Sequence, residues 1–516
     1  MKKGSARIQK WTAVVIAGSL LALALAGCAK EGGKSGAEMA QKGGEPPDKK
    51  IFTMLIDSNP TFPYKKDWPI WKWIEEKTGV SLRVQLPSGK LADTLNLVIA
   101  SNNLPDLMFM TDRRTANKYG QQGALANILD YADDMPNFKK WMEKYPEMVR
   151  QALSADGKLF MFPNEGFGET NRMIWMYRED VFAKHGLKPP TTYDELYEAA
   201  KQLKTLYPDS YPFSFRFGEE LGIFANLAEN FETGSDIYYH FGSKEWEYGP
   251  IQDNYKKLVE AMHRMYKDGL IPPDWLSIQT KQWQDIVSTN KAFITVDYIS
   301  RIDFFNIPLR KDDPSFNLAF MEPPAGWAGA KQFNPYLHTL ETGLTVASTS
   351  SHITDVMKYM DFFYSEEARV IASWGKEGET FTTEDGTRKF KADFADAVDL
   401  RSKTGIATNG AYTWIDYDSQ LALASEDLQK AYEQARKFDA KLQPKPAFNE
   451  QETEVLALTG EAVKKHRSEN IAKFILGTRS LSDWDQYVKE AENLGLQKLL
   501  DIYKQAYARA AELQLK

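Results

Sequence analysis

Cysteine is nearly absent from this chain of 516 residues, in which Cys28 is the single example. One thiol forms no disulfide within the chain and no cysteine cluster for a metal, so we expect neither in the folded body. Histidine is scarce as well, and its six positions do not follow the spacings typical of metal ligands. The sequence therefore predicts no metal site.

The chain also lacks a net positive charge and the common catalytic motifs. Its formal net charge is -7, whereas nucleic-acid binding needs a clustered positive face, so we expect no nucleic acid as a partner. No G-x-S-x-G, H-E-x-x-H or glycine-rich phosphate loop occurs in a suitable context, and we expect no cofactor and no catalytic residue. A pair of acids for glycosidic hydrolysis stays open, because 71 acidic residues always offer pairs and only their separation in space decides.

Long apolar runs are missing after residue 28, and the one before it is short. Residues 1–27 begin with basic residues and turn apolar from Trp11 to Ala26, which predicts a signal peptide rather than a membrane span. The next residue completes Leu25-Ala26-Gly27-Cys28, which matches the bacterial lipobox. That resemblance implies cleavage before Cys28 and a diacylglycerol on its thiol, whose acyl chains, such as palmitate, anchor the protein on the outer face of the cell membrane. Residues 28–50 follow as the lipidated cysteine and a flexible tether, and we expect a Gram-positive source.

The remaining body, residues 51–516, is too long for a single core and should form two lobes. Its first part alternates expected strands with helices. The strands are expected at 51–56, 80–84 and 104–110, and the helices at 68–78 and 91–101. This alternation predicts an α/β fold whose mainly parallel sheet binds ligands beyond the carboxyl ends of its strands. Candidate residues there are Asn59, Phe62, Asp112 and Arg113, although each could equally be a solvated loop residue.

Two segments carry a family resemblance. A helical run over 355–373 stops at Trp374-Gly375, and a turn between Gly375 and Gly378 follows. Together with residues 474–507, this pattern resembles the large extracellular solute-binding proteins of ABC sugar importers (solute-binding protein family 1), in particular the LipO-like and alginate-oligosaccharide-binding group. The resemblance covers nearly the whole chain from residue 28 onward.

The resemblance implies a two-lobe, periplasmic-binding-protein-like fold of type II, with crossing hinge strands between the lobes and extra C-terminal helices. We expect lobe 1 at about 51–172 plus part of 300–345, and lobe 2 at about 180–300 plus much of 346–516. Such a protein captures an oligosaccharide between its closing lobes and delivers it to the transmembrane subunits of an ABC permease. It is expected to be a monomer and not an enzyme. A surface-anchored glycoside hydrolase or lyase, and a ligand sensor for a signalling kinase, are the alternatives.

Candidate ligand contacts follow from the resemblance and from the abundance of aromatic residues, which make up 13% of the chain. Pyranose rings stack on aromatic rings, so a minority of these residues should line the sugar site. Beyond the four residues already named, the candidates are Arg216, Asp297, Tyr298, Arg301, Trp327, Trp374, Glu379, Tyr412 and Trp414. A strand end packed by Tyr298 is the alternative there. Convergence of Arg113, Arg216 and Arg301 would favour an acidic sugar. Residues 207–212 contain a single acid, which does not supply the six or more oxygens of a calcium site.

Overall fold

The computed structural model describes residues 50–166, 172–218, 224–335 and 342–513. Residues Lys49–Lys516 form one compact unit, distinct from Met1–Asp48. Cys28, the predicted signal peptide and the predicted tether up to residue 49 lie outside the described residues. Within the described ranges, no helix is long and apolar enough to cross a membrane.

The first lobe is built on a four-stranded sheet with the order β2-β1-β3-β9. Strand β1 (Lys50–Leu55) pairs in parallel with β2 (Val80–Gln85) and β3 (Leu107–Met110), and β9 (Gly343–Val346) pairs antiparallel to β3. These positions confirm the three predicted strands. All four residues of β3 are buried, because helices cover both faces of this sheet.

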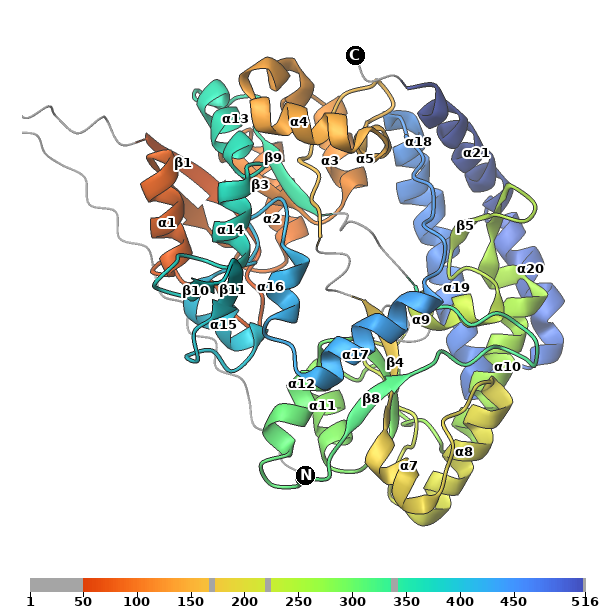
Figure 1. The fold of residues 1–516 in the computed structure, drawn as a ribbon. Coiled ribbons are helices and arrows are strands. Elements are labelled where there is room, and N and C mark those ends of the chain that lie inside the picture. The colour runs from red at the N-terminus through yellow and green to blue at the C-terminus, as the bar shows by residue number, and fades with distance from the viewer. Residues whose placement is uncertain (1–49, 167–171, 219–223, 336–341, 514–516) are drawn as a thin grey trace, which may run out of the picture. The chain divides into compact units, whose positions relative to one another are not determined.

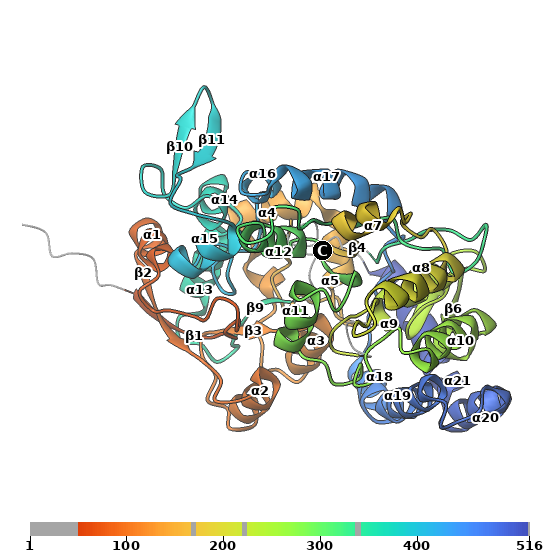
Figure 2. The same cartoon turned by 90° about the horizontal axis from the view of Figure 1, so that it is seen from below.

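The helices of the first lobe lie around this sheet (Figure 1). They are α1 (Pro69–Thr78), α2 (Leu91–Ala100), α3 (Arg113–Gln121), α4 (Pro136–Lys144), α5 (Pro146–Ala152), α13 (Ile353–Phe362), α14 (Glu366–Ser373) and α15 (Ala397–Thr404). A hairpin of β10 (Phe381–Glu384) and β11 (Thr387–Phe390) projects from α14 and α15 (Figure 2), and its residues 382–389 are exposed.

The second lobe is built on a three-stranded antiparallel sheet with the order β7-β4-β8. Its strands are β4 (Met173–Arg178), β7 (Ile294–Tyr298) and β8 (Leu318–Met321). A second pair, β5 (Ile237–His240) and β6 (Glu245–Tyr248), lies apart from this sheet. The helices up to the C-terminal region are α7 (Glu179–His185), α8 (Tyr193–Leu206), α9 (Phe224–Leu227), α10 (Asp253–Lys267), α11 (Thr280–Ser288), α12 (Arg301–Leu309), α16 (Tyr417–Leu421) and α17 (Glu426–Ala435).

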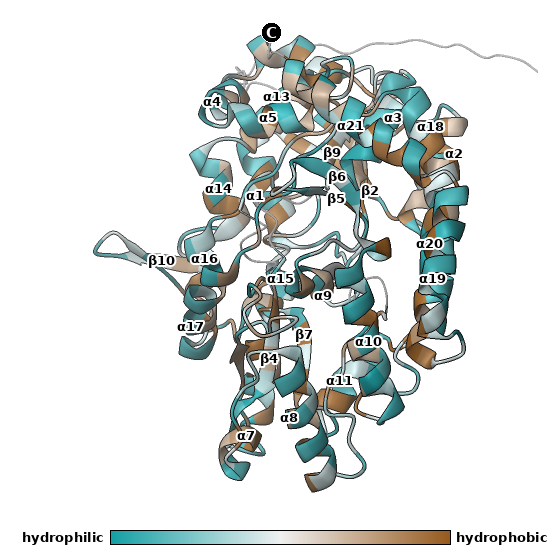
Figure 3. Ribbon diagram, turned by 90° about the vertical axis from the view of Figure 1, so that its right-hand side faces the viewer, coloured by the Kyte–Doolittle hydropathy of each residue, from teal (hydrophilic) through white to brown (hydrophobic). Residues whose placement is uncertain are grey.

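Four further helices form the C-terminal region. They are α18 (Glu450–Val455), α19 (Glu461–Leu476), α20 (Trp484–Asn493) and α21 (Leu496–Glu512). Hydrophobic and hydrophilic residues alternate along α19 and α20 (Figure 3), as expected of helices that cover a core. Helix α19 packs on α10, whereas α18 packs on α3 of the first lobe, so this region contacts both lobes. The predicted extra C-terminal helices are thus confirmed.

The hydrophobic cores show how residues 300–516 divide between the lobes. Residues 344–415 contribute to the same hydrophobic core as β1 and β3. Residues 302–321 pack in the cores of the second lobe. The reason is the pairing of two strands, since β8 adds to β4 and β9 adds to β3. Hydrophobic pattern predicts a strand but does not say which sheet it joins.

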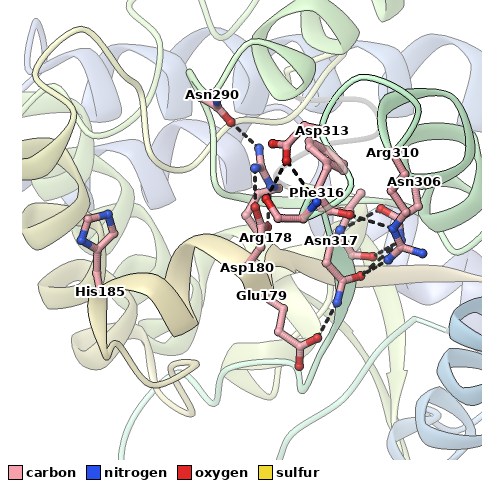
Figure 4. A network of polar contacts seen from close by, with 12 residues as sticks. Arg178, Glu179, Asp180, His185, Asn290, Asn306, Arg310, Asp313, Phe316 and Asn317 are labelled. Atoms are coloured by element: carbon pink, nitrogen blue, oxygen red, sulfur yellow. Dashed lines mark hydrogen bonds and ion pairs between the residues drawn. The ribbon is translucent and has the colours of Figure 1, made fainter.

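A polar network surrounds Arg178, the last residue of β4 (Figure 4). Arg178 donates to both oxygens of Asp180 at 2.8 and 2.6 Å and to Oδ1 of Asn290 at 2.5 Å, and its guanidinium lies 3.9 Å from the ring centre of Phe316. Asn317 donates to Glu179 at 2.6 Å, which ties the start of α7 to β8. Because Arg178 is buried and its charge is paired, we interpret this network as structural.

Candidate functional site

Three connections join the lobes along the chain: the first runs from α5 to β4, the second from β8 to β9, and the third from α15 to α16. In both lobes, strand ends meet these connections. The last residue of β3, Met110, pairs with Gly343, the first residue of β9 after the second connection. The last residue of β7, Tyr298, likewise pairs with Met173, the first residue of β4 after the first connection. We call these two places the crossing edges. They are where ligands of such sheets are expected.

A small pocket opens at the crossing edge of the first lobe. Its lining comes from the end of β3, from all three connections and from the start of β9: Phe109, Phe162, Asn164, Thr342, Gly343, Leu344, Gly410, Tyr412 and Thr413. Tyr412 is the only predicted site residue in this lining, and burial raises the pKa of its hydroxyl. A neutral phenol that lines a pocket offers a sugar both an aromatic ring and a hydroxyl group.

Phe62 lies near Arg401, whose charge acts on Tyr412 of this pocket. Asn59 and Asp112, in contrast, make local hydrogen bonds to the backbone. Phe62 is half-buried, and the guanidinium of Arg401 lies 5.6 Å from its ring centre. Asn59 is exposed and accepts a hydrogen bond from the backbone of Thr61 at 2.8 Å, as in a turn. Asp112 accepts from the backbone N–H of Thr115 at 2.7 Å and is therefore the N-cap of α3.

Arg113 lies apart from the other two candidate arginines, Arg216 and Arg301. It donates from Nη2 to the carbonyl of Pro446 at 3.4 Å, toward the C-terminal region. Arg216 and Arg301, in contrast, both bind Asp297 at the crossing edge of the second lobe. Two of the three arginines therefore meet at one carboxylate.

The group of Arg216, Asp297, Tyr298 and Arg301 is compact. Asp297 is 1% exposed and accepts from Arg216 at 2.5 and 3.0 Å and from Nε of Arg301 at 2.9 Å. The guanidinium of Arg216 lies 5.7 Å from the ring centre of Tyr298. Burial, and then the negative charge of Asp297, raise the pKa of the Tyr298 hydroxyl, while the two arginines oppose this shift. The group offers a ring, a phenol and guanidinium donors at one edge.

Trp374 and Trp414 are packed inside the first lobe. Trp374 is 4% exposed, stacks on Phe390 with ring centres 4.7 Å apart, and donates from Nε1 to Asp416 at 3.0 Å. Trp414 is 7% exposed, and Arg369 lies 4.4 Å from its ring centre. Protein atoms thus cover faces that a sugar would need, which favours a structural role for both rings.

Glu379 and Trp327 are more accessible. The exposed carboxylate of Glu379 accepts from Trp73 Nε1 at 3.0 Å and pairs with Lys376 at 3.1 Å, and this pairing lowers its pKa. Trp327 is half-buried on the loop after β8, and the ammonium of Lys257 lies 4.5 Å from its ring centre.

Sequence reasoning missed a second aromatic and cationic group, which comes from α15, α16 and α17. Arg401 donates to Gln420 at 3.0 Å, and its charge acts on both Tyr412 and Tyr432. Burial raises the pKa of Tyr432, whose ring centre lies 5.6 Å from that of Tyr417. These residues are scattered over a helical stretch and form no motif. Tyrosines that lie close to arginines in the sequence are the one cue that could have pointed to them.

No group of three or more His, Cys, Asp or Glu side chains that could hold a metal ion occurs in the part of the chain that the structure describes. The side chains at the crossing edges are suited to hydrogen bonding, stacking and charge pairing. The arrangement can therefore hold a polar ligand that has apolar faces.

Comparison with known proteins agrees with this geometry. The chain is 24% identical to the polygalacturonan/rhamnogalacturonan-binding protein YtcQ of Bacillus subtilis, over 97% of this chain and 99% of that protein. It is 22% identical to the fructooligosaccharide ABC transporter substrate-binding protein FusA of Streptococcus pneumoniae, over 89% and 90% of the two chains. Among solved structures, the alginate-binding protein AlgQ2 without calcium ion is similar with a TM-score of 0.78 at 21% identity, over 90% of this chain and 99% of that one.

A family model provides the assignment itself. The model for bacterial extracellular solute-binding proteins matches residues 63–370, which include β2, β3 and β9 of the first lobe and the β7-β4-β8 sheet of the second lobe. The chain belongs to the family of bacterial extracellular solute-binding proteins.

Proposed function

We propose that this solute-binding protein is lipid-anchored at Cys28, captures an oligosaccharide between its two lobes and delivers it to an ABC importer. The observation that carries the proposal is the gathering of aromatic and hydrogen-bonding side chains at both crossing edges, where the lobes are connected. Relatives named for binding polygalacturonan and fructooligosaccharides support a saccharide as the ligand class.

The contacts proposed for the sugar come from both lobes. Phe62 and Tyr412 of the first lobe and Tyr298 of the second supply rings for stacking, and Arg301 supplies donors for hydroxyl oxygens. Trp327 is a further stacking candidate because its ring is partly exposed on a loop. No chemistry on the sugar is required.

Closure follows from differential affinity. A ligand that touches both lobes only in the closed form shifts the equilibrium toward that form. The size of the shift is set by the difference between its affinities for the closed and the open form. The permease subunits would then recognise the closed protein, which is held near them by the acyl chains on Cys28.

The test is a thermal-shift screen of the purified protein against oligosaccharides, with analysis of the sugars after long incubation. A ligand that binds only the folded state raises the melting temperature by mass action. We expect a clear shift and an unchanged saccharide. A shift accompanied by cleavage would replace the proposal by a hydrolase or lyase. If cells that lack the gene for this protein still take up the saccharide, a role as a ligand sensor for a signalling kinase would be favoured instead.

A further inference from the structure

The crossing edge of the second lobe holds two guanidinium groups and one carboxylate. Asp297 uses its oxygens for Arg216, for Nε of Arg301 and for the backbone N–H of Tyr298 at 2.8 Å. A single carboxylate neutralises one positive charge, so this three-residue group retains one.

Other described groups around the pair do not remove this charge. Nη1 of Arg216 donates to the hydroxyl of Thr280 at 3.0 Å, and this neutral group adds no negative charge. Asp303, two residues beyond Arg301, is occupied elsewhere, since it accepts from the backbone N–H of Ser425 at 2.9 Å and from the hydroxyl of that serine. Burial raises the pKa of Asp303, which further weakens it as a counter-charge.

Arg301 still has donors to offer. Among the described residues, only its Nε has a hydrogen-bond partner, and the side chain is 13% exposed. Its guanidinium lies 5.5 Å from the ring centre of Trp283 and 5.0 Å from that of Phe304. The planar group is thus held in place with its two Nη groups available. A fixed fork of this kind loses little conformational freedom when it binds a planar carboxylate with two parallel hydrogen bonds.

We propose that the saccharide ligand is acidic, and that Arg301 receives one of its carboxylates while Asp297 holds the guanidinium in position. This inference rests on the proposed function and specifies its ligand as a uronate-containing oligosaccharide. A partly buried positive charge is costly without a partner, and a uronate supplies the missing negative charge together with a sugar ring that stacks on Tyr298.

The experiment compares matched acidic and neutral ligands on the purified protein by isothermal titration calorimetry. The probes are trigalacturonate, its methyl-esterified form and the corresponding neutral galactotriose, and then trimers of mannuronate, guluronate and glucuronate. We expect at least one free-acid trimer to bind about tenfold or more tighter than its neutral counterpart, because charge-assisted hydrogen bonds are about twice as strong as neutral ones. Raising the salt concentration should narrow this difference.

Arg301→Gln is the matched variant, because glutamine keeps a donor and removes the charge. It should lower the affinity for the acidic trimer about tenfold more than the affinity for the neutral trimer, which loses only hydrogen bonds between neutral hydroxyls and the guanidinium. The control is Arg150→Gln, which removes an arginine that pairs with Glu147 on the surface of α5 and should alter neither affinity.

Each outcome decides a different claim. Equal binding of acidic and neutral trimers by the native protein overturns the acidic-ligand inference and leaves the oligosaccharide-binding proposal standing, and this result does not depend on whether the variant folds. Binding of none of these trimers overturns the acidic-ligand inference, and the thermal-shift screen then decides the oligosaccharide-binding proposal. Cleavage of a tightly bound uronate overturns the transport proposal and supports the acidic ligand.

Discussion

Arg178→Ala should destabilise the protein strongly while leaving saccharide binding intact. The side chain of Arg178 is 2% exposed and makes two hydrogen bonds to Asp180, one to Asn290 and a close cation–π contact with Phe316. Its removal leaves the carboxylate of Asp180, itself 13% exposed, without its charge partner.

The magnitude follows from the burial of this pair. Breaking a buried ion pair by removing one partner costs about 3–5 kcal/mol, mostly because the other charge stays buried. An exposed pair contributes about 0–1 kcal/mol, so Arg150→Ala on the surface of α5 is the control. The network of Figure 4 contains Arg178, the last residue of β4, which lies at the opposite end of that strand from Met173 at the crossing edge, so ligand affinity should not change.

The assay is urea unfolding followed by tryptophan fluorescence, with calorimetric titration of a bound saccharide in parallel. The double variant Arg178→Ala/Asp180→Ala should recover part of the loss, because it removes the uncompensated charge as well. A loss below about 1 kcal/mol in the single variant, or no recovery in the double variant, would refute the argument that the buried charge dominates.

Three further predictions concern other parts of the chain. Trp374→Ala should cost about 3–5 kcal/mol of stability, measured by urea unfolding, because it empties a buried site, whereas a loss of ligand affinity at unchanged stability would restore Trp374 to the binding site. Burial raises the pKa of Glu229 from 4.5 to about 7, so the folded state binds more protons than the unfolded state between these values and stability should fall as the pH rises through this window. Glu229→Gln should abolish that slope in melting curves recorded from pH 4 to pH 8, and a slope equal to that of the native protein would contradict the assignment. Cys28→Ala should release the protein from the membrane fraction and prevent incorporation of labelled palmitate, whereas continued membrane retention would argue against the lipobox.

Local sequence determined the strands and helices well where the chain is regular. Phe52, Met54, Leu55 and Ile56 of the first apolar run are buried, and so are the four apolar residues of β3, as their pattern predicts. The cap residue Thr192 begins α8, with its hydroxyl accepting from the backbone of Glu195 at 3.2 Å. Family membership was also readable, because the motifs at 363–381 and 474–507 are local in sequence.

Only the tertiary structure decided which residues meet. Asp297 lies 81 residues from Arg216 in sequence and yet accepts two of its hydrogen bonds, because a parallel bridge sets Phe213 beside Ile294. The division of the chain between lobes also depended on pairing, since β9 joins β3 of the first lobe rather than continuing the second. Similarly, the sequence made Trp374 a candidate ligand contact, but Phe390 of the following hairpin stacks on its ring.

The physical reason is the range of the interactions. Hydrophobic period, caps and turns act over a few residues, so a sequence by itself determines elements and, through motifs, the family. Sheet pairing, buried ion pairs and ring stacking act between segments far apart in the chain, and their outcome depends on how whole elements pack. For this protein, sequence therefore determined a two-lobe solute-binding fold, and tertiary structure alone decided that Arg216 and Arg301 share one carboxylate at the crossing edge of the second lobe.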